Sequence, residues 1–302
     1  MVEIKEIEDI VKIAKKRGRK RCICIKGEDE VSLRSLQHAY EEGIVKPIIY
    51  GSKEKIKEKA KELNIDPDVF EIHDVSDSVE AARQGVIDVG ENGDFLLKGL
   101  IKTSIFLKSV LNKEWGLRTE RVLSHVAVIK PPMYGKLLFF TDGGMNIKPN
   151  MDMKVDIINN VVELAKKFGI KIPKVALLSA IEVVNPDMED TVEWSIITKM
   201  AERGQIKGAK VDGPMALDVA VSKNSAEIKG VISEVAGDAD IIVFPEIVSS
   251  NSTAKSLIYL GGAKACGIVV GASKPVVMLS RADDALTKFY SISLGSIAVE
   301  EL

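Results

Sequence analysis

The chain alternates between amphipathic segments with a helical period and short apolar segments of strand length. Over residues 3–17 the apolar side chains recur every three or four positions, which predicts a helix with one buried face. Helix-like VSLRSLQHAYEEG then precedes strand-like KPIIYG, and SKEKIKEKAKELNI precedes VFEIHDV. Apolar strands that alternate with helices are typical of a parallel sheet covered by helices on both faces.

The alternation is interrupted between residues 122 and 141. There VLSHVAVIK and KLLFF, separated by turn-forming PPMYG, predict an antiparallel hairpin. A second series follows, with helices in residues 151–168, TVEWSIITKMAERG and STAKSLIYLGGA, and strands in KVALLSA, ADIIVFPEI and PVVML. We therefore predict an α/β protein of two domains, residues 1–135 with 275–302 and residues 136–274, each a parallel sheet between helix layers. The default ligand site is then a cleft between the two lobes.

The composition is that of an ordinary globular protein. Of the 302 residues 46% are hydrophobic and 28% charged, with a formal net charge of −2, which favours neither nucleic acid nor a membrane surface as partner. The one basic run, KKRGRKR, ends an amphipathic segment and is interpreted as a solvated helix end, the alternative being contact with a nucleotide 3′-phosphate. With no leader or membrane-spanning apolar stretch, we expect a cytoplasmic protein.

Cysteine and histidine give little sign of chemistry. Cys22 and Cys24 alternate with isoleucines, which predicts one face of a buried strand. The three histidines lie far apart in the sequence; we interpret His38 as structural and His125 as a hydrogen-bonded core residue. No GxGxxG, Walker, HExxH or CxxC motif occurs, so we expect no resident metal and no histidine triad.

Polar clusters follow the predicted strands in both series. Each one alone is an ordinary turn or helix cap, but the carboxyl ends of parallel strands share one edge of a sheet, where ligands bind. Hydroxyls, glycine amides, lysine and arginine can hold phosphate without a metal. The candidate anion-binding residues are Lys102, Thr103, Ser104, Lys108, Asp142, Asn146, Ser179, Asp212, Asn251 and Lys255.

The segment MLSRADD, residues 278–284, follows the last predicted strand. Ser280 with Asp283 resembles a capping box, which explains the aspartates as part of a helix start. It does not explain Arg281, because a cation opposes the dipole at a helix start. A guanidinium beside exposed amides favours an anion, so we predict a helix start that presents Ser280 and Arg281 to an anion.

Several motifs together resemble the phosphate acetyltransferase and phosphate butyryltransferase family. DGPMALDVAVS, VAGDADIIVFPEI, NSTAKSLIYL and CGIVVGASKPVVMLSRADD occur in that order, and KGLIKTSIFLKSVLN, GLRTERVLSHVAV and FTDGGMNIKPN resemble the butyryl branch in particular. The resemblance covers roughly residues 80–302. It implies an architecture like that of isocitrate and isopropylmalate dehydrogenases, with the C-terminal segment rejoining the first domain.

The resemblance also implies an activity, reversible transfer of a short acyl group, butyryl in the first instance, between coenzyme A and inorganic phosphate. The partners would be acyl-CoA, inorganic phosphate and acyl phosphate, with coenzyme A as co-substrate, no permanently bound cofactor, and a homo-oligomeric enzyme. The anion-binding candidates would then contact phosphate and coenzyme A. Direct exchange in a ternary complex suffices for this chemistry.

The same resemblance assigns roles within MLSRADD. The acetyl branch carries Ser-Arg-Gly here and, seven positions after the serine, an aspartate proposed as the base for the thiol. By this match Ser280 would hydrogen-bond the sulfur or the developing oxyanion, and Arg281 would hold phosphate. Because position 287 is threonine in this chain, we take Asp284, one helical turn after Ser280, as the candidate base and Asp283 as the second choice.

Three other functions stay open at this point. Phosphate acetyltransferase activity differs only in the width of the acyl pocket. A metal- and NAD-dependent 2-hydroxyacid dehydrogenase would need paired aspartates, and Asp187 and Asp190 have a suitable spacing but lie in a predicted loop. A non-catalytic protein that binds coenzyme A or acyl phosphate is the third.

Overall fold

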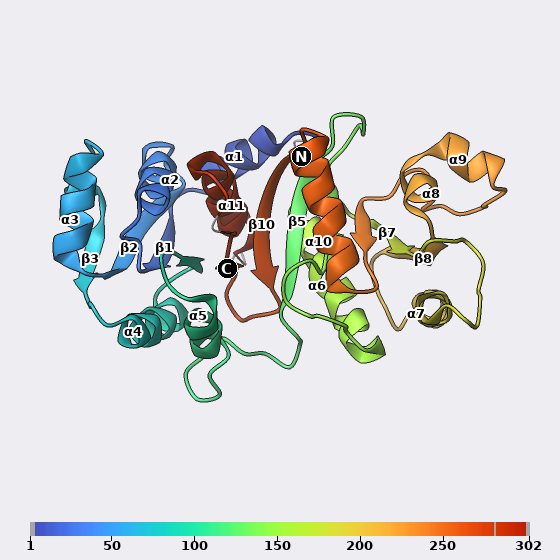
Figure 1. The fold of residues 1–302 in the computed structure, drawn as a ribbon, viewed down its shortest axis with the longest axis horizontal. Helices are drawn as coiled ribbons and strands as arrows, with labels where there is room; N and C mark the ends of the chain where they lie inside the picture. The colour runs from blue at the N-terminus through green and yellow to red at the C-terminus, as the bar shows by residue number, and fades with distance from the viewer. Residues whose placement is uncertain (1–3, 281, 300–302) are drawn as a thin grey trace. The chain divides into compact units, whose positions relative to one another are not determined.

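The structure, a computed structural model, describes residues 4–280 and 282–299 (Figure 1). These residues form two compact units. We call residues 8–121 with those from 266 onward the flanking unit, and residues 122–265 with those up to Ile7 the middle unit. No helix of the described residues is both long and apolar enough to span a bilayer.

The flanking unit contains a mostly parallel sheet. Its strands are β1 (Lys20–Ile25), β2 (Val45–Gly51), β3 (Glu71–Asp74), β4 (Phe95–Lys98), β10 (Lys264–Val270) and β11 (Val276–Val277). They lie in the order β3-β2-β1-β4-β11-β10, and all neighbours are parallel except β10 with β11. Because β11 pairs with β4, Val276 and Val277 complete a sheet begun by the first strands of the chain.

Helices cover both faces of this sheet, with α2 and α11 on one face and α4 and α5 on the other (Figure 1). The helices are α1 (Ile7–Lys16), α2 (Glu30–Glu41), α3 (Lys53–Glu62), α4 (Ser78–Glu91), α5 (Thr103–Val110) and α11 (Ala285–Ala298), with a 3₁₀ turn at Pro67–Val69. Helices α2 and α11 contact each other through His38, whose ring stacks on Phe289 at 3.8 Å. This contact supports the structural interpretation of His38.

The strands of the middle unit, called the middle sheet below, follow the order β5-β6-β9-β7-β8. They are β5 (Ser124–Lys130), β6 (Leu138–Thr141), β7 (Lys174–Leu178), β8 (Lys210–Met215) and β9 (Ile241–Val243). Strands β5 and β6 form the predicted antiparallel hairpin, and the other neighbours are parallel. Pairing such as Val126 with Thr141 keeps both hairpin strands in one unit, whereas the sequence-based division at residue 135 runs between them.

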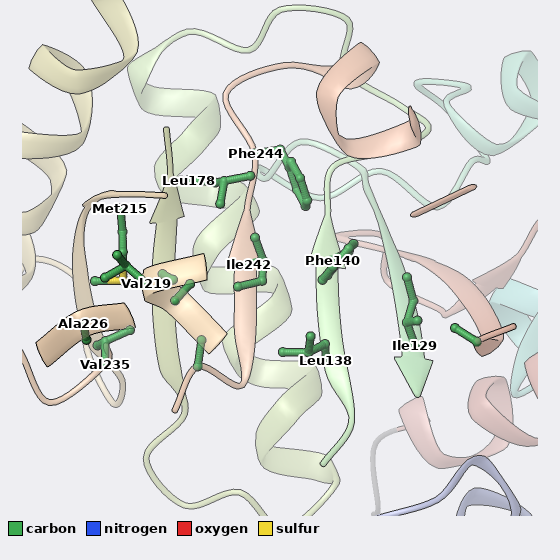
Figure 2. Close-up of a cluster of buried hydrophobic side chains, with 14 residues drawn as sticks. Ile129, Leu138, Phe140, Leu178, Met215, Val219, Ala226, Val235, Ile242 and Phe244 are labelled. Carbon is green, nitrogen blue, oxygen red and sulfur yellow. The ribbon is translucent and has the colours of Figure 1, made fainter. Parts of the chain in front are cut away.

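An apolar core lies on one face of the middle sheet, where Phe140, Ile242 and Leu178 from β6, β9 and β7 face Val219 of α8 (Figure 2). The helices of this unit are α6 (Met151–Lys167), α7 (Glu189–Glu202), α8 (Leu217–Val221), α9 (Lys223–Ile228) and α10 (Ile247–Lys255), followed by a π-helical turn at Ser256–Leu260. Full burial of side chains of this size stabilises the fold by about 1.5–3 kcal/mol each.

Helix α10 begins earlier than the segment STAKSLIYLGGA predicted. The carboxylate of Glu246 caps it by accepting hydrogen bonds from the amides of Val248 and Ser249, both at 2.7 Å. Burial alone would raise the pKa of Glu246, but these hydrogen bonds outweigh burial and hold the pKa below its ordinary value. The cap therefore fixes where the helix begins.

The basic run KKRGRKR forms contacts within the flanking unit. Arg17 donates to the carbonyl of Ile297 at the end of α11, and the guanidinium of Arg19 lies 4.2 Å from the ring centroid of Tyr40. Lys15 pairs with Glu42 at 2.6 Å. These contacts agree with the interpretation of the run as a helix end.

Gly99 allows the loop after β4 to lie against the end of β1. Its amide donates to the carbonyl of Ile25 at 2.9 Å, and a Cβ at this position would lie 2.3 Å from the carbonyl oxygen of Lys26. We expect Gly99→Ala to lower the free energy of unfolding by about 2–3 kcal/mol, because main chain must move to make room. The measurement is a urea titration.

Gly135→Ala is the matched control, because a Cβ there meets no atom within 4 Å. We expect that variant to stay within about 0.5 kcal/mol of the parent protein. A Gly99→Ala protein of parental stability would contradict the close approach of the two strand ends.

Candidate functional site

The flanking unit brings two of the predicted clusters to neighbouring strand ends. Strands β4 and β11 are adjacent and parallel, so KGLIKTS after β4 and MLSRADD after β11 lie at the same edge of the sheet. Lys102 immediately precedes α5, and Thr103, Ser104 and Lys108 are exposed on that helix. Ser104 and Lys108 are one turn apart and share a face.

The geometry of MLSRADD differs from the predicted capping box. Helix α11 begins at Ala285, and its cap is Asp284, whose Oδ1 accepts the amide of Thr287 at 2.7 Å. Ser280 and Asp283 form a turn before the helix, in which the Ser280 amide donates to Asp283 Oδ2 at 2.9 Å. The helix start at Ser280 was therefore wrong, and Asp284 is not one helical turn beyond Ser280. Arg281 lies outside the described residues.

Buried hydrogen bonds fix the first turns of α11. The ammonium of Lys288, 7% exposed, donates to Ser32 Oγ at 2.7 Å, and that hydroxyl donates to Asp29 Oδ2 at 2.5 Å. Asp29 is also the cap of α2, at the end of the loop that follows β1. The helix that follows MLSRADD is thus tied to the neighbouring strand-end loop.

A buried ion pair connects the remaining loops of this edge. Lys26 Nζ lies 2.6 Å from Glu28 Oε1, with side chains 7% and 8% exposed, and donates to the carbonyl of Ser76 at 3.0 Å. Glu28 also accepts the amide of Ser52, the cap of α3, at 2.6 Å. The loops after β1, β2 and β3 are therefore held together by one charged pair.

The cysteines are not available as nucleophiles. Cys22, Cys24 and Cys266 are buried, and burial raises the pKa of the Cys24 thiol to about 12. Burial likewise raises the pKa of Cys22 and Cys266. Since the thiolate is the reactive form, all three are inert at neutral pH.

In the middle unit, Asp142 organises the loop that follows β6. Its carboxylate, only 3% exposed, accepts the amides of His125, Gly144, Met145 and Asn146 and the side-chain amide of Asn146, at 2.7–3.0 Å. A carboxylate offers about four lone-pair sites, so these hydrogen bonds occupy all of its acceptor positions. Asp142 therefore shapes the loop, and the geometry does not support the predicted contact with a ligand.

Asn146 has a similar role, because its side-chain amide also donates to the carbonyl of Leu123 at 2.7 Å. Beside it, α10 packs against the same loop, with Asn251 Nδ2 donating to the carbonyl of Gly143 at 3.0 Å. Asn251 and Lys255 are exposed and one turn apart on α10. These two remain candidates for contact with a ligand.

Two further predicted residues have structural partners. Ser179 follows β7, as predicted, and its hydroxyl donates to Asp190 Oδ2 in the first turn of α7 at 2.6 Å. Asp212 was predicted at a strand end but lies within β8, where Oδ1 accepts the amide of Gly213 at 2.9 Å. The strand continues through Pro214 because β8 is an edge strand, where proline is tolerated.

The sequence did not indicate the hydrogen bonding of His125. Its backbone is paired, with the amide bonded to Asp142 and the carbonyl accepting the Thr141 hydroxyl at 3.0 Å. Its Nδ1 is buried and has no hydrogen-bond partner among the described residues, so the prediction of a hydrogen-bonded core histidine was wrong. Burial lowers the pKa of His125, and the nearby charge of Asp142 opposes this only in part.

The described residues include no group of three or more His, Cys, Asp and Glu side chains that could hold a metal ion. Asp187 lies in the loop before α7 while Asp190 lies in its first turn, so the two aspartates do not share a helical face. The pair that a metal-dependent dehydrogenase would need is not formed by these residues.

Fold and strand-end chemistry together define a two-unit α/β protein with hydroxyl, lysine and glycine-amide groups at the ligand-binding edges of its parallel sheets. The chain belongs to the family described as "Phosphate acetyl/butaryl transferase", whose model matches residues 6–88 and 83–295.

The similarity to individual members of the family is extensive. The chain is 42% identical over 296 residues to phosphate butyryltransferase from Clostridium acetobutylicum, covering 97% of this chain and 98% of that protein. It is 40% identical to phosphate acetyltransferase from Thermotoga maritima, over 96% of this chain and 99% of that protein. A branched-chain phosphotransacylase from Enterococcus faecalis V583 has a similar structure, with a TM-score of 0.82 and 33% identity over 92% of this chain and 99% of that one.

The role of Asp142 can be tested by Asp142→Asn, which replaces an acceptor oxygen by an NH₂ group that faces backbone N–H donors. We expect the free energy of unfolding to fall by about 2–3 kcal/mol in urea titrations. Asp187→Asn, in the loop before α7, is the control and should change it by less than about 0.5 kcal/mol. If Asp142→Asn kept full stability and only weakened phosphate binding, Asp142 would be a ligand contact after all.

Proposed function

We propose that this protein transfers a short acyl group, butyryl in preference to acetyl, between coenzyme A and inorganic phosphate. The observation that carries the proposal is the near full-length similarity to phosphate butyryltransferase of Clostridium acetobutylicum. Coenzyme A is then a co-substrate rather than a resident cofactor. A homo-oligomeric assembly is part of the proposal.

The preference for a four-carbon chain has support from the loop after β6. Ile147 of this loop is 76% exposed and Val248, in the first turn of α10, is 65% exposed. The two segments are in contact, because the amide of Ile247 bonds to the carbonyl of Ile147 at 3.1 Å. Such side chains offer apolar surface to an acyl chain. Each methylene contributes only about 1 kcal/mol, so phosphate acetyltransferase activity, the second candidate, should accompany the first.

The proposed reaction is direct exchange in a ternary complex. In the synthesis of acyl-CoA the thiol loses its proton to a base, the sulfur attacks the acyl phosphate carbonyl, and phosphate leaves with the bonding electron pair. A base is needed because a thiol of pKa about 8.5 is mostly protonated at neutral pH. The inert cysteines fit a mechanism without an acyl-cysteine.

Within this reaction Ser280 hydrogen-bonds the sulfur or the oxyanion, Arg281 holds phosphate, and Asp284 is the base, with Asp283 second. Ser280 is exposed at the edge of the sheet, and the carboxylate of Asp284 lies beside the backbone of Thr287, the position where the acetyl branch carries its aspartate. Asp283, in contrast, already accepts the Ser280 amide. Lys102, Thr103, Ser104, Lys108, Asn251 and Lys255 supply the remaining anion contacts.

The first test measures free thiol released from acetyl-, propionyl-, butyryl- and isobutyryl-CoA with and without inorganic phosphate. We expect phosphate-dependent release that is fastest for four-carbon chains and falls at least 100-fold in Arg281→Ala, because a charged phosphate contact is lost. Absence of phosphate-dependent thiol for every substrate would overturn the proposal and leave the binding-protein alternative. Activity with NAD⁺ and a divalent metal would support a dehydrogenase instead.

A second test separates the two roles of Asp284. Asparagine caps helices as well as aspartate does but is not a base, so Asp284→Asn should keep the free energy of unfolding within about 0.5 kcal/mol. We expect kcat to fall by about 10²–10⁴-fold, the contribution of a general base. Asp283→Asn is the comparison, and a larger loss of kcat in that variant would move the base to Asp283.

A further inference from the structure

His125 lies near the beginning of β5, at the edge of the middle sheet where the parallel strands β6, β9 and β7 end. Strands β5 and β6 are antiparallel, so the beginning of β5 adjoins the end of β6 and its glycine loop. The ring packs against Gly144, where a Cβ would lie 3.2 Å from both Cβ and Cγ of His125. The histidine is therefore next to the loop that Asp142 organises, and its side chain is only half-buried.

The unpaired Nδ1 indicates which ring nitrogen carries the proton. A buried N–H without a partner is rarer in proteins than a buried acceptor without one. The favoured tautomer of His125 therefore leaves Nδ1 unprotonated and carries the hydrogen on Nε2. Burial lowers the pKa of His125, so the ring is neutral at neutral pH. The result is a neutral N–H donor at the edge of the sheet.

Hydrogen-bond donors in fixed positions accelerate acyl transfer, because negative charge develops on the carbonyl oxygen during attack. The position of His125 is fixed from two sides. Its amide donates to the buried carboxylate of Asp142 at 3.0 Å, and its carbonyl accepts the hydroxyl of Thr141 at 3.0 Å. A donor held by backbone bonds needs little reorganisation when the charge appears.

We propose that Nε2–H of His125 donates a hydrogen bond to the carbonyl oxygen of the transferred acyl group, making His125 a catalytic residue of the middle unit. This inference rests on the proposed acyl transfer. When phosphate attacks acyl-CoA, a C–O bond forms and the carbonyl π electrons move to oxygen. The C–S bond then breaks, and the sulfur leaves with its electron pair as thiolate. His125 keeps its proton throughout and stabilises the tetrahedral intermediate.

The test compares His125→Ala, His125→Gln and His125→Asn in phosphate-dependent thiol release from butyryl-CoA. The amide nitrogen of glutamine reaches the place of Nε2, and that of asparagine the place of Nδ1. We expect kcat to fall about 10²–10³-fold in the alanine and asparagine variants and to recover at least tenfold in the glutamine variant. His73→Ala is the control, since His73 is half-buried in the flanking unit and contacts Glu71 at 3.3 Å and the ring of Tyr50 at 4.4 Å, none of them a candidate site residue; kcat should not change.

A readout that does not depend on turnover is the infrared stretch of the thioester carbonyl of butyryl-CoA bound without phosphate. A hydrogen bond to the carbonyl lowers this frequency, so it should be lower in the parent protein and His125→Gln than in His125→Ala. Parental kcat in His125→Ala, or a carbonyl frequency that is the same in all variants, would overturn the role of His125. If the parent protein itself released no thiol, the proposed function would be wrong, and not only the role of His125.

Discussion

Parallel pairing is the constraint on which the rest of the structure depends. When strands run in the same direction, the backbone that leaves each of them does so at one edge, and in the flanking unit those exits carry Lys26, Lys102 and Ser280. Residues almost two hundred positions apart, such as Lys102 and Ser280, follow adjacent strands for this reason alone. Reactive groups can therefore lie on adjacent strand ends without being close to one another in the sequence.

Side chains at an exposed edge of a sheet keep their positions only if buried hydrogen bonds or ion pairs fix the loops that carry them. In the flanking unit this is done by charge, through Lys26 with Glu28 and through Lys288 with Ser32. In the middle unit one carboxylate, Asp142, gathers amides from a whole loop. Several charged residues near the candidate sites are thus structural, and the exposed hydroxyls and cations around them are the groups left for substrates.

The layered α/β architecture, the hairpin and the clusters at strand ends could be predicted from the sequence. Hydrophobic periodicity and turn residues are local properties, and each predicts the secondary structure of its own segment. The sequence did not determine which of Ser280, Asp283 and Asp284 caps α11, since all three residue types can cap and contacts distant in sequence, such as Lys288 with Ser32, help to position the helix. Asp142 looked like a ligand residue because burial cannot be inferred from a polar segment. The orphan Nδ1 of His125 depends on the hairpin register and on Gly144, neither of which a linear pattern contains.

The flanking unit is made from two stretches of chain separated by the whole middle unit, which has a consequence for biosynthesis. Strand β4 gains β11 as its neighbour only after residue 277 has been translated. Until then β4 has a free, apolar edge, the kind of surface that pairs with other chains. The middle unit, complete by residue 265, can fold first on the ribosome, so the residues made after it both close that edge and deliver Ser280 to its place.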